Sequence, residues 1–210
     1  MLDTADTEAD RLRPPRPPAN ELPHAPMSLS IYWPVGRRFR EELSSEESRG
    51  NGGYAAKNAS SGALGAYQFT RTALEDIGFW KDGAWTPESG VGSDAEFLAS
   101  PLAQEIALKR YLARGRQIAQ SKGLLDHVGQ TIQSNAAGDN FAITDNGILA
   151  AIHGAGDGWV RRYFNYLAAH DWTSDPGSFP DDKTTRERFT TIERRLRKFA
   201  DLPYFRAMGR

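Results

Sequence analysis

The chain has 210 residues, of which 39% are hydrophobic and 10% aromatic, and this is enough apolar material for one buried core. Its 26 Lys and Arg residues nearly balance its 27 Asp and Glu residues, so the overall charge favours neither nucleic acid nor an acidic membrane as a partner. Cysteine is absent, which excludes disulfides, a cysteine-ligated zinc site and a thiol nucleophile. No run approaches about 18 apolar residues, so we expect no membrane span.

Residues 1–26 differ in composition from the rest of the chain. They hold six of the twelve prolines and few large apolar side chains, so they cannot bury enough surface to offset the entropy lost on ordering. We therefore predict a disordered proline-rich arm over 1–26 and a single domain over 27–210. The first residues are acidic, whereas a Sec signal has a basic end and an apolar centre, so no such signal is expected.

The first part of the domain predicts two helices joined by an irregular loop. In RRFREELSSEESRGNGG, Phe39 and Leu43 lie one turn apart and three glycines follow, so the helix should end near residue 49. The glycine-rich stretch after it predicts a loop, with at most a small β-hairpin near residues 50–66. The loop runs into AYQFTRTALEDIGF, a second helix closed by Gly78.

The longest predicted helix is SPLAQEIALKRYLARGRQIAQSKG. Ser100 is its expected N-cap and Pro101 its first residue. Candidates for its buried side are Leu102, Ile106 and Ile118.

Three further helices follow. Thr144 is the expected cap of TDNGILAAIHGAG, which meets GDGWVRRYFNYLAAH at a glycine-rich corner. The latter segment and TTRERFTTIERRLRKFA each place four apolar residues on one helix face: Val160, Tyr163, Phe164 and Leu167, and Phe189, Ile192, Leu196 and Phe199. No repeat or convincing strand alternation is present, so we expect an all-α or α-dominated fold.

One segment carries a resemblance to a known family. EESRGNGGYAAKNASSGALGAYQFTRTAL resembles the lysozyme-like superfamily, particularly soluble lytic transglycosylases and phage-type peptidoglycan hydrolases. Their signature is a Glu-Ser pair, a loop, Gly-Ala-x-Gly and then Gln. In this chain the matching elements are Glu47-Ser48, residues 62–65 and Gln68.

A second segment strengthens the resemblance. LAAIHGAGDGWVRRY looks like the family's Ala-Ala-Tyr-Asn-Ala-Gly-Pro-Gly motif, with His153 at the tyrosine position and Gly154 at the asparagine position. The likeness covers roughly residues 37–170. It implies a lysozyme-like domain that cleaves the β-1,4 bond between N-acetylmuramic acid and N-acetylglucosamine in peptidoglycan.

The resemblance places the catalytic acid at Glu47. Such an acid must carry a proton, and burial at a helix end under an apolar wall would raise the pKa of its carboxyl group. A helical wheel does not choose between Glu46 and Glu47, since both lie within about 60° of the direction of Phe39 and Leu43. The Glu-Ser pair alone favours Glu47.

The resemblance also implies a sugar-binding loop, because small residues let the backbone approach a saccharide. The implied substrate-binding residues are Ser48, Tyr54, Ser60, Ser61, Gly62, Ala63, Tyr67, Gln68 and His153. His153 replaces the usual tyrosine with a titratable hydrogen-bonding ring. No cofactor and no metal are implied.

The number of catalytic carboxylates separates two reactions. Lytic transglycosylases use one Glu, because the 6-hydroxyl of muramic acid attacks after the acid has become a base, whereas hydrolases commonly need a second carboxylate. The motifs mark one, which slightly favours an anhydro-sugar product over hydrolysis. For a hydrolytic muramidase, the candidate second carboxylates are Asp157 and Glu75.

Two other classes of function stay open. A non-catalytic glycan-binding module would keep the groove without an acid, and an exposed or salt-bridged Glu47 would support it. A helical DNA-binding domain could use RERFTTIERRLRKF, since residues 183–210 contain nine Lys or Arg against three Asp or Glu. That run lacks a helix-turn-helix pattern, so we favour a solvated face or a contact to the anionic wall and expect no nucleic acid partner.

The expected partner is therefore the peptidoglycan glycan strand, bound by a monomer at the bacterial cell wall or in the periplasm. Without a Sec signal, the enzyme would be delivered by phage lysis, by a virion or by a dedicated secretion system. A phage or secretion-machine partner would bind the arm over 1–26.

Overall fold

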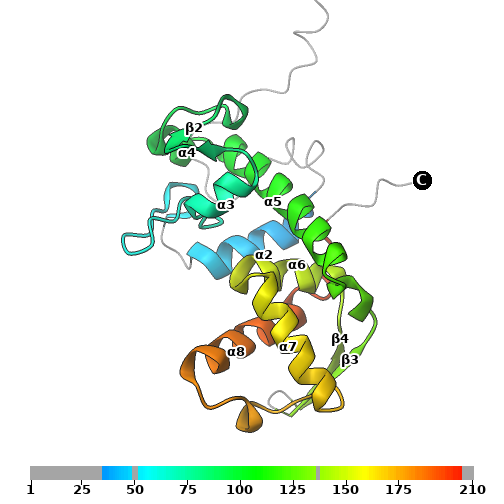
Figure 1. Ribbon diagram of the computed structural model, residues 1–210. Helices are drawn as coiled ribbons and strands as arrows, with labels where there is room; N and C mark the ends of the chain where they lie inside the picture. Colours follow the sequence, from blue (N-terminus) through cyan, green and yellow to red (C-terminus); the bar gives the residue numbers. More distant parts are fainter. Residues whose placement is uncertain (1–34, 49–51, 136–137, 205–210) are drawn as a thin grey trace, which may run out of the picture.

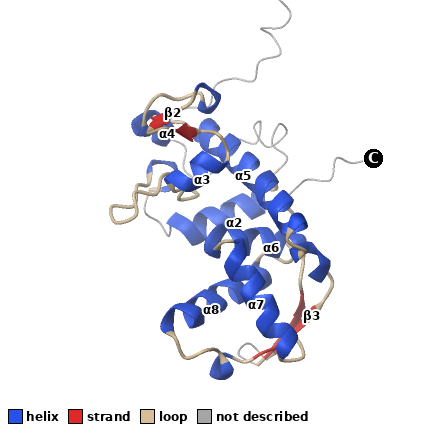
Figure 2. Ribbon diagram, in the orientation of Figure 1, coloured by secondary structure: helices blue, strands red, loops and turns tan. Residues whose placement is uncertain are grey.

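The computed structural model describes residues 35–48, 52–135 and 138–204, so the predicted arm lies outside the described residues. Helices dominate these ranges, which confirms an α-dominated fold (Figure 2). The α-helices are α2 (Arg37–Ser48), α3 (Arg71–Asp76), α4 (Asp94–Ala99), α5 (Pro101–Ser121), α6 (Asp145–Ala155), α7 (Asp157–Ala169) and α8 (Lys183–Lys198). The strands are β1 (Trp80–Lys81), β2 (Ala84–Trp85), β3 (Thr131–Ser134), β4 (Asp139–Ala142) and β5 (Thr173–Ser174).

Several helices begin and end where the local sequence predicts. α2 ends at Ser48, close to the predicted stop. The Ser100 side chain accepts a hydrogen bond from the Ala103 amide, and Pro101 is the first residue of α5. Thr144 caps α6 in the same way. These side chains satisfy amide groups that have no partner inside the helix, which explains why the local signals are reliable.

The helix predicted in AYQFTRTALEDIGF begins later than expected. α3 starts only at Arg71, because the side chain of Thr70 caps it. The residues before the cap form a turn closed by a hydrogen bond from the Gln68 amide to the Gly65 carbonyl. Gly78 follows the helix with a positive φ, in agreement with its predicted role as a stop.

The prediction for the buried side of α5 is wrong for Leu102, which is 41% exposed, while Ile106 and Ile118 are only half-buried. The buried residues are mostly small or polar: Ala103, Gln104, Glu105, Ala107, Leu108, Leu112, Gly115 and Ala119. The sequence prediction gave weight to large apolar side chains, whereas α5 packs closely against its neighbours through small ones.

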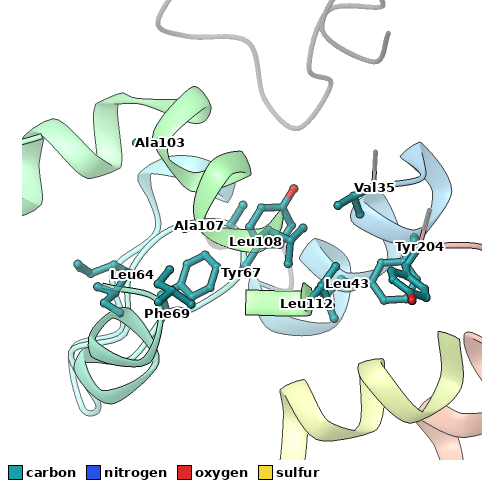
Figure 3. Packing of buried hydrophobic residues seen from close by; sticks show 14 of the residues in the cluster. Val35, Leu43, Leu64, Tyr67, Phe69, Ala103, Ala107, Leu108, Leu112 and Tyr204 are labelled. Atoms are coloured by element: carbon teal, nitrogen blue, oxygen red, sulfur yellow. The ribbon is translucent and has the colours of Figure 1, made fainter. Parts of the chain in front are cut away.

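Two buried clusters form the core, and α6 contributes to both. The first lies between α2, the loop after it, α3, α4 and α5, and includes Leu43, Phe69 and Leu108 (Figure 3). The second lies among α6, α7, α8 and β3. Leu149 belongs to the first cluster and Ile148 to the second. α6 therefore connects the two halves of the molecule (Figure 1).

The apolar faces predicted for α7 and α8 are confirmed. All eight residues are at most 1% exposed: Val160, Tyr163, Phe164, Leu167, Phe189, Ile192, Leu196 and Phe199. Burying side chains of this size contributes about 1.5–3 kcal/mol each, so these faces hold α7 and α8 in place.

The strands lie elsewhere than expected. The described part of 50–66 contains no strand, and Leu64 forms isolated antiparallel bridges with Lys57 and with Phe69. The hairpins are instead β1–β2 and β3–β4, and β5 adds to β3 in parallel. Strands of two to four residues are too short for alternation to show in the sequence. The Asp82-Gly83 pair in the first hairpin was a readable signal, since both residues have the positive φ that such turns require.

Among the helices that the structure describes, none is at once long and apolar enough to cross a membrane, which agrees with the expectation from the sequence.

Candidate active site around Glu47

Glu47 lies on the last turn of α2. Leu43 and Phe39, one and two turns earlier on the same side of this helix, are completely buried. The Ser48 hydroxyl donates to the Ser44 carbonyl at 2.8 Å, one turn earlier on the same helix. The Glu47 side chain is 18% exposed and lines a cavity of about 220 Å³. The other lining residues are Ser48, Ala56, Lys57, Asn58, Ala59 and Gln68.

The loop facing Glu47 is shaped by its own polar groups. The Asn58 side-chain oxygen accepts hydrogen bonds from the amides of Ser60 and Ser61 and from the Ser60 hydroxyl. The Gly62 amide donates to the Asn58 carbonyl at 2.8 Å. These bonds form an Asx-type turn that fixes the loop tip without any ligand.

One glycine of the loop is required by packing rather than by a sugar. Gly65 has φ +77, and a Cβ there would lie 2.0 Å from Oε1 of Gln104. Gln104 is buried on α5, accepts from the Ala66 amide and donates to the carbonyls of Tyr54 and Phe97. The loop can therefore approach α5 only with glycine at this position.

The prediction that Tyr54 and Tyr67 line the groove is wrong. Both rings are buried, and both hydroxyls donate to Oε1 of Glu105 at 2.5 Å. Arg40 donates to the other oxygen of Glu105 at 2.8 Å. A buried carboxylate needs such donors, so the two tyrosines serve the core. Burial and the Glu105 charge raise the pKa of the Tyr67 hydroxyl well above its ordinary value.

Of the other loop residues predicted to bind substrate, only Gln68 lines the Glu47 cavity. Its amide group donates to the Gly65 carbonyl at 2.9 Å. Its φ of +49 is unusual for a residue with a side chain and marks backbone strain at this point. Ser60, Ser61 and Gly62 are exposed at the loop tip and Ala63 is buried, and none of these four is among the lining residues. Sugar binding by them stays a prediction.

His153 brings the second motif to the same carboxylate. It lies near the C-terminal end of α6, and its Nδ1 is 3.1 Å from Oε1 of Glu47. The imidazole ring packs edge-on against Tyr111 and Phe69, with ring centroids 5.2 and 6.3 Å apart. Two segments separated by 106 residues thus meet at Glu47.

Arg195 is a further residue at Glu47, and no sequence motif marks it. This α8 residue donates from Nη2 to Oε1 of Glu47 at 2.5 Å and from Nη1 to the Ala150 carbonyl at 3.1 Å. Its side chain is 5% exposed, so the residue does not belong to a solvated face. A Cβ at Gly154 would lie 2.3 Å from Nε of Arg195, so glycine at this position leaves room for the guanidinium.

The basic neighbours of Arg195 on α8 also pair with carboxylates of α2. Arg194 and Lys198 form ion pairs with Glu46, and Lys198 also pairs with Glu42. Part of the basic run therefore neutralises the acidic end of α2. The predicted solvated face is wrong for Arg195, whereas Arg194 and Lys198 stay 40% and 41% exposed. The only signal was the coincidence of an acidic helix end and a basic helix end in one chain.

The structure separates Glu46 from Glu47. Glu46 is held between Arg194 and Lys198 and is not among the residues that line the cavity. Burial would raise the pKa of the Glu46 carboxyl, but these two cations lower it on balance.

The charge of Glu47 differs from the expectation. Burial alone would raise the pKa of its carboxyl group, but His153 and Arg195 outweigh burial and lower the pKa to about 2. The prediction of a raised pKa is therefore wrong for the protein without substrate. Two donors bind the charged form, and hydrogen bonds to a carboxylate favour ionisation. Glu47 is a carboxylate at neutral pH.

Neither candidate second carboxylate lines the Glu47 cavity. Asp157 begins α7 and forms an ion pair with Lys122. Glu75 is exposed and lines a different cavity of about 600 Å³, together with Trp80 and Arg110. Within the described ranges, no group of three His, Asp or Glu side chains is arranged to hold a metal ion.

Comparison of the chain with protein-family models, with curated proteins and with solved structures gives no match in any of the three. The geometry of the site and the sequence motifs are therefore the basis for a functional proposal.

Proposed function

We propose that the protein cleaves peptidoglycan at the β-1,4 bond between N-acetylmuramic acid and N-acetylglucosamine, with Glu47 as the catalytic carboxylate of a lysozyme-like domain. One observation carries the proposal: the end of α2, the loop containing Asn58 and Gln68, and His153 of the second motif converge on one carboxylate beside a cavity. The proposed partner is the glycan strand, and the proposed place of action is the bacterial cell wall.

The two oxygens of Glu47 have different surroundings. Oε1 accepts from both His153 and Arg195. Oε2 has no hydrogen-bond partner among the residues that the structure describes. A proton on Oε2 would be placed for transfer to the leaving glycosidic oxygen, while Oε1 stays anchored. The open site offers polar groups of Asn58 and Gln68 to the sugar.

A lytic transglycosylase reaction is favoured over hydrolysis. After the first proton transfer, the Glu47 carboxylate would accept the proton of the muramic acid 6-hydroxyl as that oxygen attacks the anomeric carbon. This reaction needs one carboxylate, and Glu47 is the one carboxylate among the residues that line its cavity. Hydrolysis would require Asp157 or Glu75 to activate a water.

Mass spectrometry of the products tests the proposal. Purified peptidoglycan sacculi are incubated with the protein, and the released muropeptides are analysed at their reducing ends. We expect 1,6-anhydro-muramic acid ends. Reducible N-acetylmuramic acid ends would establish hydrolysis instead, and the absence of any released fragment across a wide pH range would contradict enzymatic cleavage.

A second function is favoured by one observation. The ion pair between Glu47 and Arg195 is the arrangement expected of a glycan-binding module, which needs no proton donor. Such a module would sediment with sacculi, release no fragment, and bind equally well after Glu47→Gln. The same incubation therefore distinguishes binding from cleavage.

A further inference from the structure

Glu47 can act as an acid only if it gains a proton, and Arg195 opposes that step. The guanidinium of Arg195 donates to Oε1 of Glu47 at 2.5 Å from a position that is almost fully buried. A buried charge-assisted hydrogen bond of this kind is among the stronger interactions in a protein. The protonated form of Glu47 would lose most of its attraction to this cation.

The position of Arg195 is determined from two sides. Its Nη1 donates to the Ala150 carbonyl of α6, and Gly154, one turn further along, leaves the space that the guanidinium fills. Nε of Arg195 is buried without a hydrogen-bond partner. An unpaired buried N–H is unfavourable, so the position of the guanidinium is maintained by its other contacts, with Glu47 and with the Ala150 carbonyl.

The other titratable and charged groups near Glu47 can be taken one element at a time. From α6, His153 is the second direct donor. From the loop, Lys57 lines the cavity but forms an ion pair with Asp94. From α5, the pKa of the Tyr111 hydroxyl is raised by burial, then by the charge of Asp76 and then by that of Glu47. From α8, Arg194 is engaged with Glu46. His153 and Arg195 are therefore the two direct partners that favour the charged form of Glu47, and Arg195 is the one that stays a cation at every working pH.

We propose that Arg195 is a positioning residue for Glu47: it anchors Oε1, leaves Oε2 for the substrate, and confines the acid step to low pH. The proposal rests on the proposed cleavage reaction for its catalytic meaning. Its claim about the protonation of Glu47 depends only on the hydrogen bond between Arg195 and Glu47.

The sign of the effect follows from the charge. A cation beside a carboxyl group favours its ionised form, so loss of the cation raises the pKa of Glu47. Above that pKa, each unit of increase raises the protonated fraction about tenfold. The pH at which cleavage falls on the alkaline side should therefore be higher in a variant without the Arg195 contact.

Two variants break the contact by different routes. Arg195→Gln removes the charge but keeps a donor. Gly154→Ala keeps the charge but places a Cβ 2.3 Å from Nε of Arg195, so the guanidinium must shift from its present position; we expect this to break the contact with Glu47. Arg194→Gln is the matched control, because it removes a neighbouring cation of the same helix that contacts Glu46 instead.

The experiment measures the Glu47 carboxyl directly by carbon-13 NMR over a pH titration, and kcat/KM for wall fragments over the same pH range. We expect Arg195→Gln and Gly154→Ala each to raise the Glu47 pKa by about one unit or more, and to move the alkaline limb of activity upward by a similar amount. Arg194→Gln should move neither. The double variant Gly154→Ala with Arg195→Gln should shift no further than Arg195→Gln alone, because both act on one contact.

A wild-type titration of Glu47 in either folded variant would overturn the proposal. Since Gly154→Ala adds a methyl group and Arg195→Gln removes a charge, a folding defect in one leaves the other informative. If the wild type releases no fragment at any pH, the proposed function fails, whereas the NMR titration still decides whether Arg195 controls Glu47.

Discussion

Two carboxylates in this protein are each paired with an arginine, and they differ in what else surrounds them. Glu105 is 1% exposed, and Arg40, Tyr54 and Tyr67 occupy both of its oxygens. Glu47 is 18% exposed and lines a cavity. Its two donors, His153 and Arg195, both bind Oε1, and Oε2 has no partner among the described residues. Pairing with arginine is therefore common to both carboxylates, and the feature that sets Glu47 apart is an oxygen without a described hydrogen-bond partner beside a cavity.

The largest expected effect is on activity, from Glu47→Gln. Cleavage of purified peptidoglycan should fall by about 100-fold or more, since general acid–base catalysis contributes about 10²–10⁴ in rate. The circular dichroism spectrum should not change. Glu46→Gln is the control, because Glu46 is held by Arg194 and Lys198, and it should keep most of the activity. Equal losses in the two variants would contradict the difference between these neighbours.

The matching change at the structural carboxylate should act on stability. Glu105→Ala leaves the buried Arg40 without its anion and should lower the free energy of unfolding by about 3–5 kcal/mol, as measured by urea denaturation. Glu75→Ala, at an exposed position, should change it by no more than about 0.5 kcal/mol. Similar small losses in both would show that the Glu105 network is not part of the core.

The pH dependence of stability gives a third test. The pKa of Glu47 is about 2 in the folded protein against an ordinary value of 4.5, so its ionised form stabilises the fold above pH 4.5. This contribution, about 3 kcal/mol, is lost as the pH falls from 4.5 through 2. Glu47→Gln should therefore lose less stability than the wild type between those pH values in acid denaturation. Parallel curves for the two proteins would mean that His153 and Arg195 do not favour the charged form.

The smallest expected effect concerns Tyr67→Phe. Removing the hydroxyl deletes one hydrogen bond to the Glu105 carboxylate and should lower the free energy of unfolding by about 1–3 kcal/mol. Co-sedimentation with sacculi should be unchanged, because the ring is buried and does not line the cavity. Weaker sedimentation without loss of stability would instead indicate that Tyr67 contacts the glycan.

The sequence alone determined the features that depend on neighbours within a few residues. The caps Ser100 and Thr144, the end of α2 and the buried faces of α7 and α8 were predicted correctly, because helix ends and amphipathic faces follow from local hydrogen bonding and a period of 3.6 residues. The Glu-Ser pair and the motif around His153 also directed attention to the two residues that meet in the structure.

Only the tertiary structure decided which distant groups meet. Arg195 lies 148 residues after Glu47, and a helical wheel shows which way a side chain points but not what it will contact. Tyr67 looked suited to a sugar-binding groove, yet the buried charge of Glu105 draws its hydroxyl into the core. Because a carboxyl pKa depends on all the charges and donors packed around it, the ionised state of Glu47 could be known only once α6 and α8 were in place.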